Sequence, residues 1–213
     1  MDFLLILALI RPFRRMSEVP IRPAASLVLV RRGDTDSVLM GQRGSGAVFM
    51  PSKYVFPGGR VDPTDDAEHA GLSSTCAARL GLHALDDHPS PAALIACARR
   101  ELREETGLSL APSAPMRFIF RAITPPGSPR RFDARFFLTA AEDVEGALDD
   151  FSTAGDELSH LHWVALNQTR TLDLPFITEI VLAELRALLS GLDQPGVPFF
   201  DNSGQVPTFR RLV

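Results

Sequence analysis

The sequence predicts an α/β fold in which helices cover both faces of one sheet. Three observations lead to this prediction. Several short segments have the alternating or continuous apolar pattern of strands, and two longer segments, 91–106 and 175–190, have apolar residues at helical spacing. Turn residues, mainly glycine and proline, separate these segments. Because helices and strands are interspersed along the chain, a layered arrangement around a sheet is the expected packing.

The first strands are expected to form a hairpin. Residues 24–32 (AASLVLVRR) are rich in apolar and β-branched side chains, Gly33-Asp34 signals a turn, and a second strand follows at 37–41. Residues 44–59 mix glycine and proline with aromatic side chains, which suits a structured loop. We expect this loop to lead to a short strand at 54–56 that ends at Gly58-Gly59.

A helix over 91–106 is the best-defined element that the sequence predicts. Ser90 is a suitable N-cap, Pro91 suits the first helical position, and Gly107 marks the end. The preceding segment, about 66–89, is polar and acidic at its ends, with a short helix expected within 67–82. We interpret this segment as an insertion that lies outside the main core. Further strands are expected at 116–123, 132–139 and 161–166, and a second helix at 175–190 that closes at Gly191.

The composition is that of one ordinary globular domain with substantial loops. The chain has 213 residues, of which 45% are hydrophobic and 23% charged, with 17 prolines. A net charge of −4 gives no general attraction to nucleic acid or to an anionic membrane, so neither is an expected partner. Cys76 and Cys97 lie in no disulfide-like or zinc-like pattern, which favours reduced thiols and a cytoplasmic setting.

Residues 1–19 are expected to form an extension of a domain that spans 20–213. The apolar run at 3–10 is shorter than the ~20 residues of a membrane span. Arginines follow this run, whereas a secretory signal carries its positive charge before it. A true start at Met16 and a weak surface anchor are alternatives to a loose extension.

The helix over 91–106 carries three neighbouring glutamates, Glu101, Glu104 and Glu105. Their spacing of i, i+3 and i+4 makes them repel one another by roughly 0.2–0.5 kcal/mol per pair. Two of them, Glu101 and Glu105, border the apolar stripe of the helix. Several carboxylates without His or Cys are the ligands that Mg²⁺ or Mn²⁺ prefers. The alternative is a solvated charged face on which Arg100 pairs with Glu104.

The wider pattern resembles the signature of the Nudix hydrolases. RELREETGL at 100–108, preceded by FPGGRVD at 56–62, matches every specified position of the core Arg-Glu-apolar-any-Glu-Glu-any-Gly-apolar. The signature departs in its spacing, because Asp65 stands in place of a glutamate and 34 residues, 66–99, separate it from Arg100 where the family usually has seven. The first acidic position is therefore either Asp65 or absent.

The resemblance implies a Nudix-type α/β/α sandwich with a mixed sheet between helices, and a metal-dependent hydrolase. Glu101, Glu104 and Glu105 would be catalytic and would bind Mg²⁺ or Mn²⁺, with a backbone carbonyl near Gly59 as a further ligand. Arg100 would have a supporting catalytic role by orienting a glutamate. The bond cleaved would be the diphosphate linkage of a nucleoside-diphosphate derivative.

A base for the attacking water must come from one of these carboxylates or from a more distant acid. Asp156 and Glu157 are candidates, and a solvated loop is the alternative interpretation of both. Arg43, Arg130, Arg131 and Glu157 are the candidate substrate-binding residues.

The long segment after FPGG, together with FMPSKYVFPGG at 49–59, resembles the branch related to the peroxisomal coenzyme A diphosphatases. This resemblance implies coenzyme A or an acyl-coenzyme A as the small-molecule substrate. The Arg-rich signature of better-defined coenzyme A hydrolases is not matched, because 38–51 offers only Arg43. ADP-ribose, NADH or an oxidised nucleotide are alternative substrates, and a ligand-binding sensor is an alternative function. The sequence is compatible with a homodimer.

Overall fold

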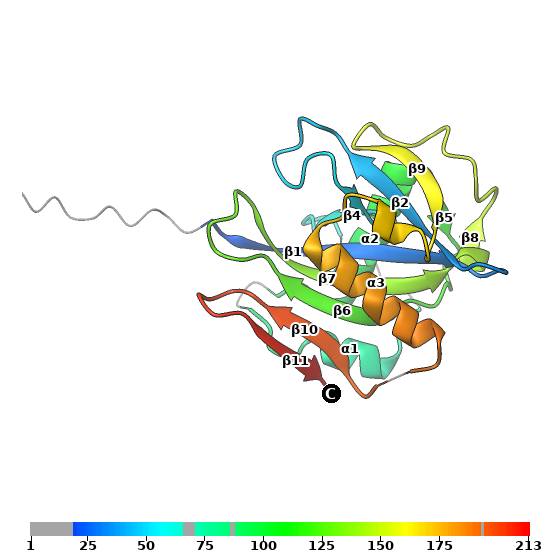
Figure 1. Ribbon diagram of the computed structural model, residues 1–213. Coiled ribbons are helices and arrows are strands. Elements are labelled where there is room, and N and C mark those ends of the chain that lie inside the picture. The colour runs from blue at the N-terminus through cyan, green and yellow to red at the C-terminus, as the bar shows by residue number, and fades with distance from the viewer. Residues whose placement is uncertain (1–18, 66–70, 86–87, 193) are drawn as a thin grey trace, which may run out of the picture.

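Figure 1 shows the computed structural model, which describes residues 19–65, 71–85, 88–192 and 194–213. The predicted N-terminal extension, apart from its last residue, lies outside this part of the chain. Within the described residues, nine strands form one sheet in the order β11-β10-β6-β7-β1-β2-β3, with β4 paired to β1 and β9 paired to β2. The strands are β1 (Ile21–Arg31), β2 (Ser37–Arg43), β3 (Tyr54–Val55), β4 (Gly58–Arg60), β6 (Arg117–Ile123), β7 (Arg131–Ala140), β9 (Leu158–Ala165), β10 (Val197–Asp201) and β11 (Thr208–Leu212).

The sheet is mixed, as the resemblance implied. The pairs β1–β7 and β6–β10 are parallel, and the other pairs are antiparallel. A separate small sheet joins β5 (Ser109–Leu110) to β8 (Val144–Glu145). Short 3₁₀ helices lie at Ala141–Asp143 and Thr169–Thr171.

Helices cover both faces of the sheet. On one face, α2 (Pro91–Thr106) and α1 (Ser74–Leu80) form a core with inward residues of β1 such as Leu27. On the other face, α3 (Phe176–Leu189) packs against alternate residues such as Val28, and Figure 1 shows it lying across the sheet. Successive strand residues point to opposite faces, so one apolar run in β1 serves two cores. None of the helices in the described ranges is long and apolar enough to cross a bilayer.

The helix α2 begins and ends where its capping residues predict. The Ser90 hydroxyl accepts a hydrogen bond from the Ala93 N–H at 3.0 Å, and Pro91 is the first helical residue. At the other end Gly107 adopts a left-handed conformation with φ of 77°, and its N–H donates to the Arg103 carbonyl. This well-defined helix gives the glutamate cluster a rigid base.

The expectation that the segment 66–89 lies outside the core is wrong for its described part. Its helix α1 buries Cys76 and Leu80 among the core residues beneath the sheet. The carbonyl of Leu82 accepts a hydrogen bond of 2.7 Å from the buried guanidinium of Arg121 on β6. The polar residues at the ends of the segment suggested a solvent-exposed insertion, but the helix α1 between them is amphipathic and supplies apolar side chains to the main core.

Candidate active site

Two glycines of β4 bring the backbone directly against α2. The N–H of Gly58 donates to Glu105 Oε2 at 2.8 Å. A Cβ atom built on Gly59 would lie 2.3 Å from Glu101 Oε1, so a larger residue there would displace the carboxylate. The glycine pair thus permits two glutamates to lie immediately beneath a strand.

Glu101 and Glu105 are buried, so they lie deeper than the border of the apolar stripe where the sequence placed them. Glu105 is 3% exposed, and burial raises its pKa to about 8, opposed by the Gly58 N–H and reinforced by repulsion from Glu101. Burial also raises the pKa of Glu101. Within the described residues, Glu105 Oε1 is buried and has no hydrogen-bond partner. A buried carboxylate oxygen without a partner is costly, and a cation would satisfy it.

Arg100 links this pair to two further acids. Its guanidinium donates to both carboxylate oxygens of Asp65 at 2.9 Å, to Glu101 Oε1 at 2.8 Å and to Glu104 Oε2 at 3.0 Å. Burial acts to raise the pKa of Asp65, but the bonds from Arg100 hold it below its ordinary value. Asp65 therefore occupies a specific place in the site, which the sequence left open. Arg100 contacts the glutamate that the resemblance implies it should orient.

Glu104 lies apart from the other two glutamates. Its side chain is 53% exposed and turns toward Arg100. In the part of the chain that the structure describes, no three His, Cys, Asp or Glu side chains converge closely enough to form a metal-binding group by themselves. The all-oxygen donor set and the unpartnered Glu105 oxygen nevertheless fit a hard divalent cation.

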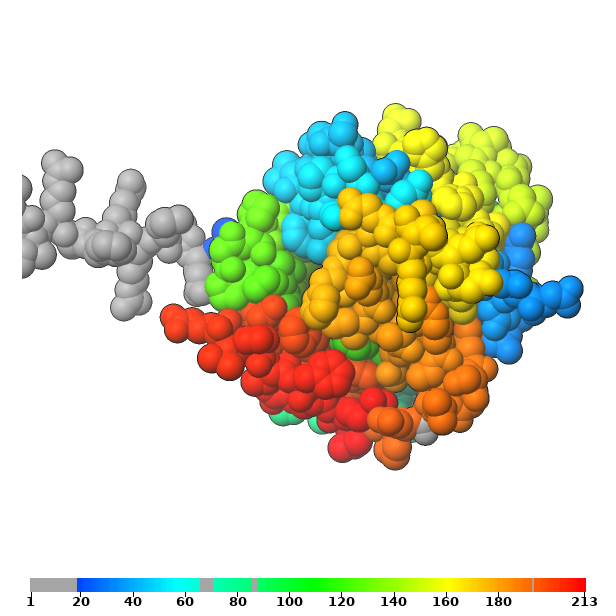
Figure 2. Space-filling model, viewed as in Figure 1, coloured from blue at the N-terminus to red at the C-terminus, as the bar shows by residue number. Residues whose placement is uncertain are grey.

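A cleft with a volume of about 890 Å³ opens beside the glutamates on the α3 side of the sheet. Its lining includes six residues that the sequence proposed for the site, namely Arg43, Gly59, Glu101, Arg130, Arg131 and Glu157. Figure 2 shows the face on which the loop 44–53, the loop before β7, the start of α3 and the β10–β11 turn come together. Glu104, Glu105 and Arg100 do not line the cleft.

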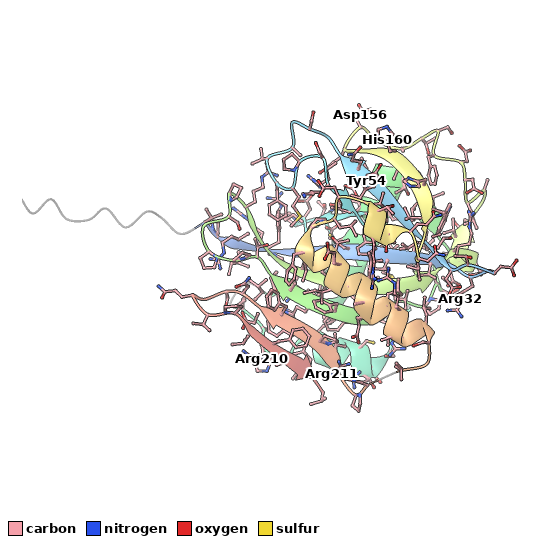
Figure 3. The ribbon with its side chains drawn as sticks, viewed as in Figure 1. Arg32, Tyr54, Asp156, His160, Arg210 and Arg211 are labelled. Atoms are coloured by element: carbon pink, nitrogen blue, oxygen red, sulfur yellow. The ribbon has the colours of Figure 1, made fainter. Side chains whose placement is uncertain are left out.

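The two candidate bases differ in position. Glu157 lines the cleft, whereas Asp156 does not, and Figure 3 shows Asp156 at the outer edge of the molecule near β9. The Arg43 guanidinium forms a salt bridge of 3.0 Å with Glu157 and donates to the Phe49 carbonyl at 3.1 Å. Arg43 thus connects the loop 44–53 to the acid at the start of β9.

The two neighbouring arginines before β7 also differ. Arg131 is buried and donates to the carbonyls of Thr124 at 3.1 Å and Ser203 at 2.7 Å. This geometry ties β7 to the β10–β11 turn. Arg130 is exposed at the edge of the cleft.

Part of the cleft is lined by aromatic side chains that the sequence did not identify as site residues. Phe49 and Phe132 meet edge to face with ring centroids 5.2 Å apart, and Phe176 and Phe200 meet at 6.2 Å. These residues come from four separate segments, so no local motif unites them. By contrast, Tyr54 packs against His162 outside the cleft lining, in agreement with the packing role that aromatic residues usually have.

Comparisons with known proteins agree with this geometry. The sequence model of the NUDIX domain family matches residues 88–185 of this chain. The chain is 32% identical over 158 residues to "Putative nudix hydrolase 7" of Caenorhabditis elegans; the match covers 67% of this chain but only 51% of that protein, so the chain spans about half the length of this relative.

Solved structures share the fold. A NUDIX hydrolase from Alicyclobacillus acidocaldarius superposes with a TM-score of 0.59 and 28% identity, covering 81% of this chain and 92% of that one. The NUDIX domain of Shewanella oneidensis NrtR, solved with ADP ribose, gives a TM-score of 0.55 at 14% identity, covering 80% and 89%, and supports similarity of fold alone.

Proposed function

This chain belongs to the Nudix family, with the family's mixed sheet and three helices, and we propose that it is a divalent-metal-dependent pyrophosphohydrolase acting on a nucleoside-diphosphate derivative. The observation that carries the proposal is the pair of buried glutamates, Glu101 and Glu105, held under the Gly58-Gly59 backbone beside a large cleft. Two buried carboxylates with an unpartnered oxygen destabilise a protein unless they serve a charged ligand.

The residues proposed to hold Mg²⁺ or Mn²⁺ are Glu101, Glu104, Glu105 and the carbonyl of Gly59. A cation bound there neutralises charge on the diphosphate and lowers the pKa of a bound water. Arg100 keeps two of the glutamates in place through the bonds described above. Its own position is set by Asp65, which lies on the opposite side of the guanidinium from Glu104 in the bonding network.

Glu157 is the residue we propose to take the proton of the attacking water. It faces the cleft, and its charge acts on both buried glutamates. Arg43 holds it through the salt bridge, so we assign Arg43 a positioning role in place of direct substrate binding. Arg130 remains a candidate for substrate binding, and Arg131 organises the wall of the cleft.

Coenzyme A or an acyl-coenzyme A is the substrate that the resemblance of 49–59 favours, while the names of the relatives offer no support for it. ADP ribose occurs in the complex of the NrtR domain, which shares only the fold, and keeps ADP-ribose among the substrates to test. NADH and oxidised nucleotides complete the set. A sensor without catalysis is the alternative function, and three retained glutamates argue against it.

The test is a panel of nucleoside-diphosphate derivatives incubated with Mg²⁺, with products identified by mass spectrometry. Coenzyme A should give 3′,5′-ADP and 4′-phosphopantetheine, whereas ADP-ribose should give AMP and ribose 5-phosphate. Glu101→Gln provides the matched control, because it keeps shape and removes one buried charge. Tight binding of one compound without turnover of any would refute the enzyme and favour the sensor.

A further inference from the structure

The proposed reaction accounts for the end of the cleft beside Gly59, Glu101 and Glu157, which we call the inner end. The other end lies near the start of β1 and the loop before β7, and we call it the outer end. It carries two arginines, Arg22 and Arg130, that take no part in the proposed bond cleavage. Arg22 of β1 pairs in register with Phe132 of β7, and residues paired across two strands point to the same face of a sheet. The next pair on this face is Ala24 and Ala134, and all four residues line the cleft. Arg130, two residues before Phe132, lines it as well.

These two arginines differ from the others that line the cleft. Arg43 pairs with Glu157 and Arg60 pairs with Asp62 at 2.9 Å, while Arg131 donates to backbone carbonyls. Across residues 19–65, 71–85, 88–192 and 194–213, neither Arg22 nor Arg130 has a hydrogen bond or salt bridge to a protein group. Two guanidinium groups therefore line one cleft, and no protein group within the described ranges accepts a hydrogen bond from either of them.

The surface beside the two arginines suits a planar ring. Phe132 lines the cleft and meets the ring of Phe49 edge to face. The floor beside it consists of small side chains, Ala24 and Ala134, which leave space above the sheet. A nucleobase can stack on an aromatic side chain of this kind, because every base has a π-face.

Charge also divides the cleft. The inner end contains Glu101 and Glu157, which repel an anion unless a cation is bound, and the outer end contains Arg22 and Arg130. A phosphate monoester carries up to two negative charges at neutral pH and accepts hydrogen bonds from several donors at once. Two forked guanidinium groups match this charge and geometry better than they match a neutral sugar.

We propose that the outer end of the cleft binds the nucleoside end of the substrate, and that Arg22 and Arg130 bind a second phosphate on that nucleoside, separate from the diphosphate that is cleaved. The proposal rests on the proposed function and narrows its substrate class to nucleotides with an additional phosphate monoester. Compounds of this class with the same diphosphate linkage exist in phosphorylated and unphosphorylated pairs, so the extra group can be tested alone.

The experiment compares kcat/KM for coenzyme A against 3′-dephospho-coenzyme A, and for NADPH against NADH, with Mg²⁺ present. The wild type should prefer the phosphorylated member of at least one pair by tenfold or more, as expected for charge-assisted hydrogen bonds in a partly enclosed site. Arg22→Gln and Arg130→Gln should each reduce that preference by about tenfold, mainly through KM. Arg170→Gln, which removes an exposed charge outside the cleft lining, is the control and should keep the wild-type ratio.

The outcomes separate the inference from the proposed function. Turnover of these pairs without preference, or a preference that survives both substitutions, would overturn the inference and leave the hydrolase standing. If none of the compounds is cleaved, binding of adenosine 3′,5′-bisphosphate and of AMP is measured by calorimetry. Tighter binding of the bisphosphate that is lost in Arg22→Gln and Arg130→Gln would support the subsite, and equal binding would refute it.

Discussion

Glu105→Gln tests the metal site and the cost of burying its carboxylate in one substitution. The pKa of Glu105 is about 8 in the folded protein, against an ordinary value of 4.5. Between these two pH values the folded state keeps a proton that the unfolded state has lost. The free energy of unfolding of the metal-free wild type should therefore fall as the pH rises through this window.

The size of the effect follows from the same numbers. A difference between 4.5 and about 8 corresponds to at most roughly 5 kcal/mol, since each pKa unit is worth about 1.4 kcal/mol. Gln avoids this cost, but its amide N–H donors occupy the position of Glu105 Oε1, which has no partner among the described residues. Leaving these buried donors unsatisfied lowers the free energy of unfolding by about 1–3 kcal/mol. We expect metal-free Glu105→Gln to be more stable than the wild type by about 2 kcal/mol at pH 9. Near pH 5 the wild type should be the equal or more stable protein.

The measurement is urea unfolding of both proteins at pH 5 and pH 9, with EDTA and with saturating Mg²⁺. A concentration of Mg²⁺ 100 times its Kd should stabilise the wild type by about 2.7 kcal/mol, and the mutant should gain much less. Glu104→Gln is the control for the pH effect, because the side chain of Glu104 is 53% exposed. Turnover of Glu105→Gln should fall by a factor on the order of 100 or more. A loss of more than ~1 kcal/mol at both pH values, with the Mg²⁺ response intact, would make Glu105 a structural residue and refute the metal site.

Three further predictions concern the support of the site. Asp65→Ala should lower the free energy of unfolding by about 2–3 kcal/mol at pH 7, because it breaks a largely buried ion pair with Arg100. Since the pKa of Asp65 is lowered in the folded protein, this contribution is lost as the pH falls, and an equal deficit at pH 2.5 in chemical unfolding would contradict the account. Replacing 66–89 by a short Gly/Ser linker should lower Tm by more than 10 °C, because α1 belongs to the core, and a melt within a few degrees of the wild type would show that α1 is dispensable. Arg43→Met and Glu157→Gln should each reduce kcat about tenfold or more, and the double variant should be little worse than either; additive losses would mean that Arg43 does not act through Glu157.

Local signals were sufficient for the helix that carries the glutamates. The helix 91–106 was predictable to the residue, because its cap, first-turn proline and terminal glycine are all encoded within 18 residues. The strands β1, β2, β3, β6, β7 and β9 followed from apolar patterns, with ends that differ by a few residues. The strands β4, β5 and β8 were missed because each has only two or three residues, and β10 and β11 were missed because VPFFD is short and TFRRL alternates poorly.

Residues that meet only through long-range pairing lay beyond the sequence. Arg22 and Phe132 are neighbours because β1 and β7 run parallel, and no periodicity reveals which strands pair. The burial of Glu105 likewise depends on β4 lying over α2, so the repulsion expected on an exposed helix understated the cost of its charge. The motif singled out the glutamates from the sequence, whereas their burial and the cost of their charge required the tertiary structure.

The bond between Asp65 and Arg100 also explains how a lengthened chain can still assemble the site. This bond joins the two ends of the segment between these residues, so the two halves of the motif meet although 34 residues separate them in the sequence. Lengthening a flexible connection from seven to 34 residues costs only about 1.4 kcal/mol of closure entropy. Burying the Leu80 side chain alone contributes about 1.5–3 kcal/mol, and α1 also places Cys76 in the core. An enlarged connection of this kind therefore adds to the stability of the fold, while the ion pair between Asp65 and Arg100 keeps the arrangement of the residues around the glutamates.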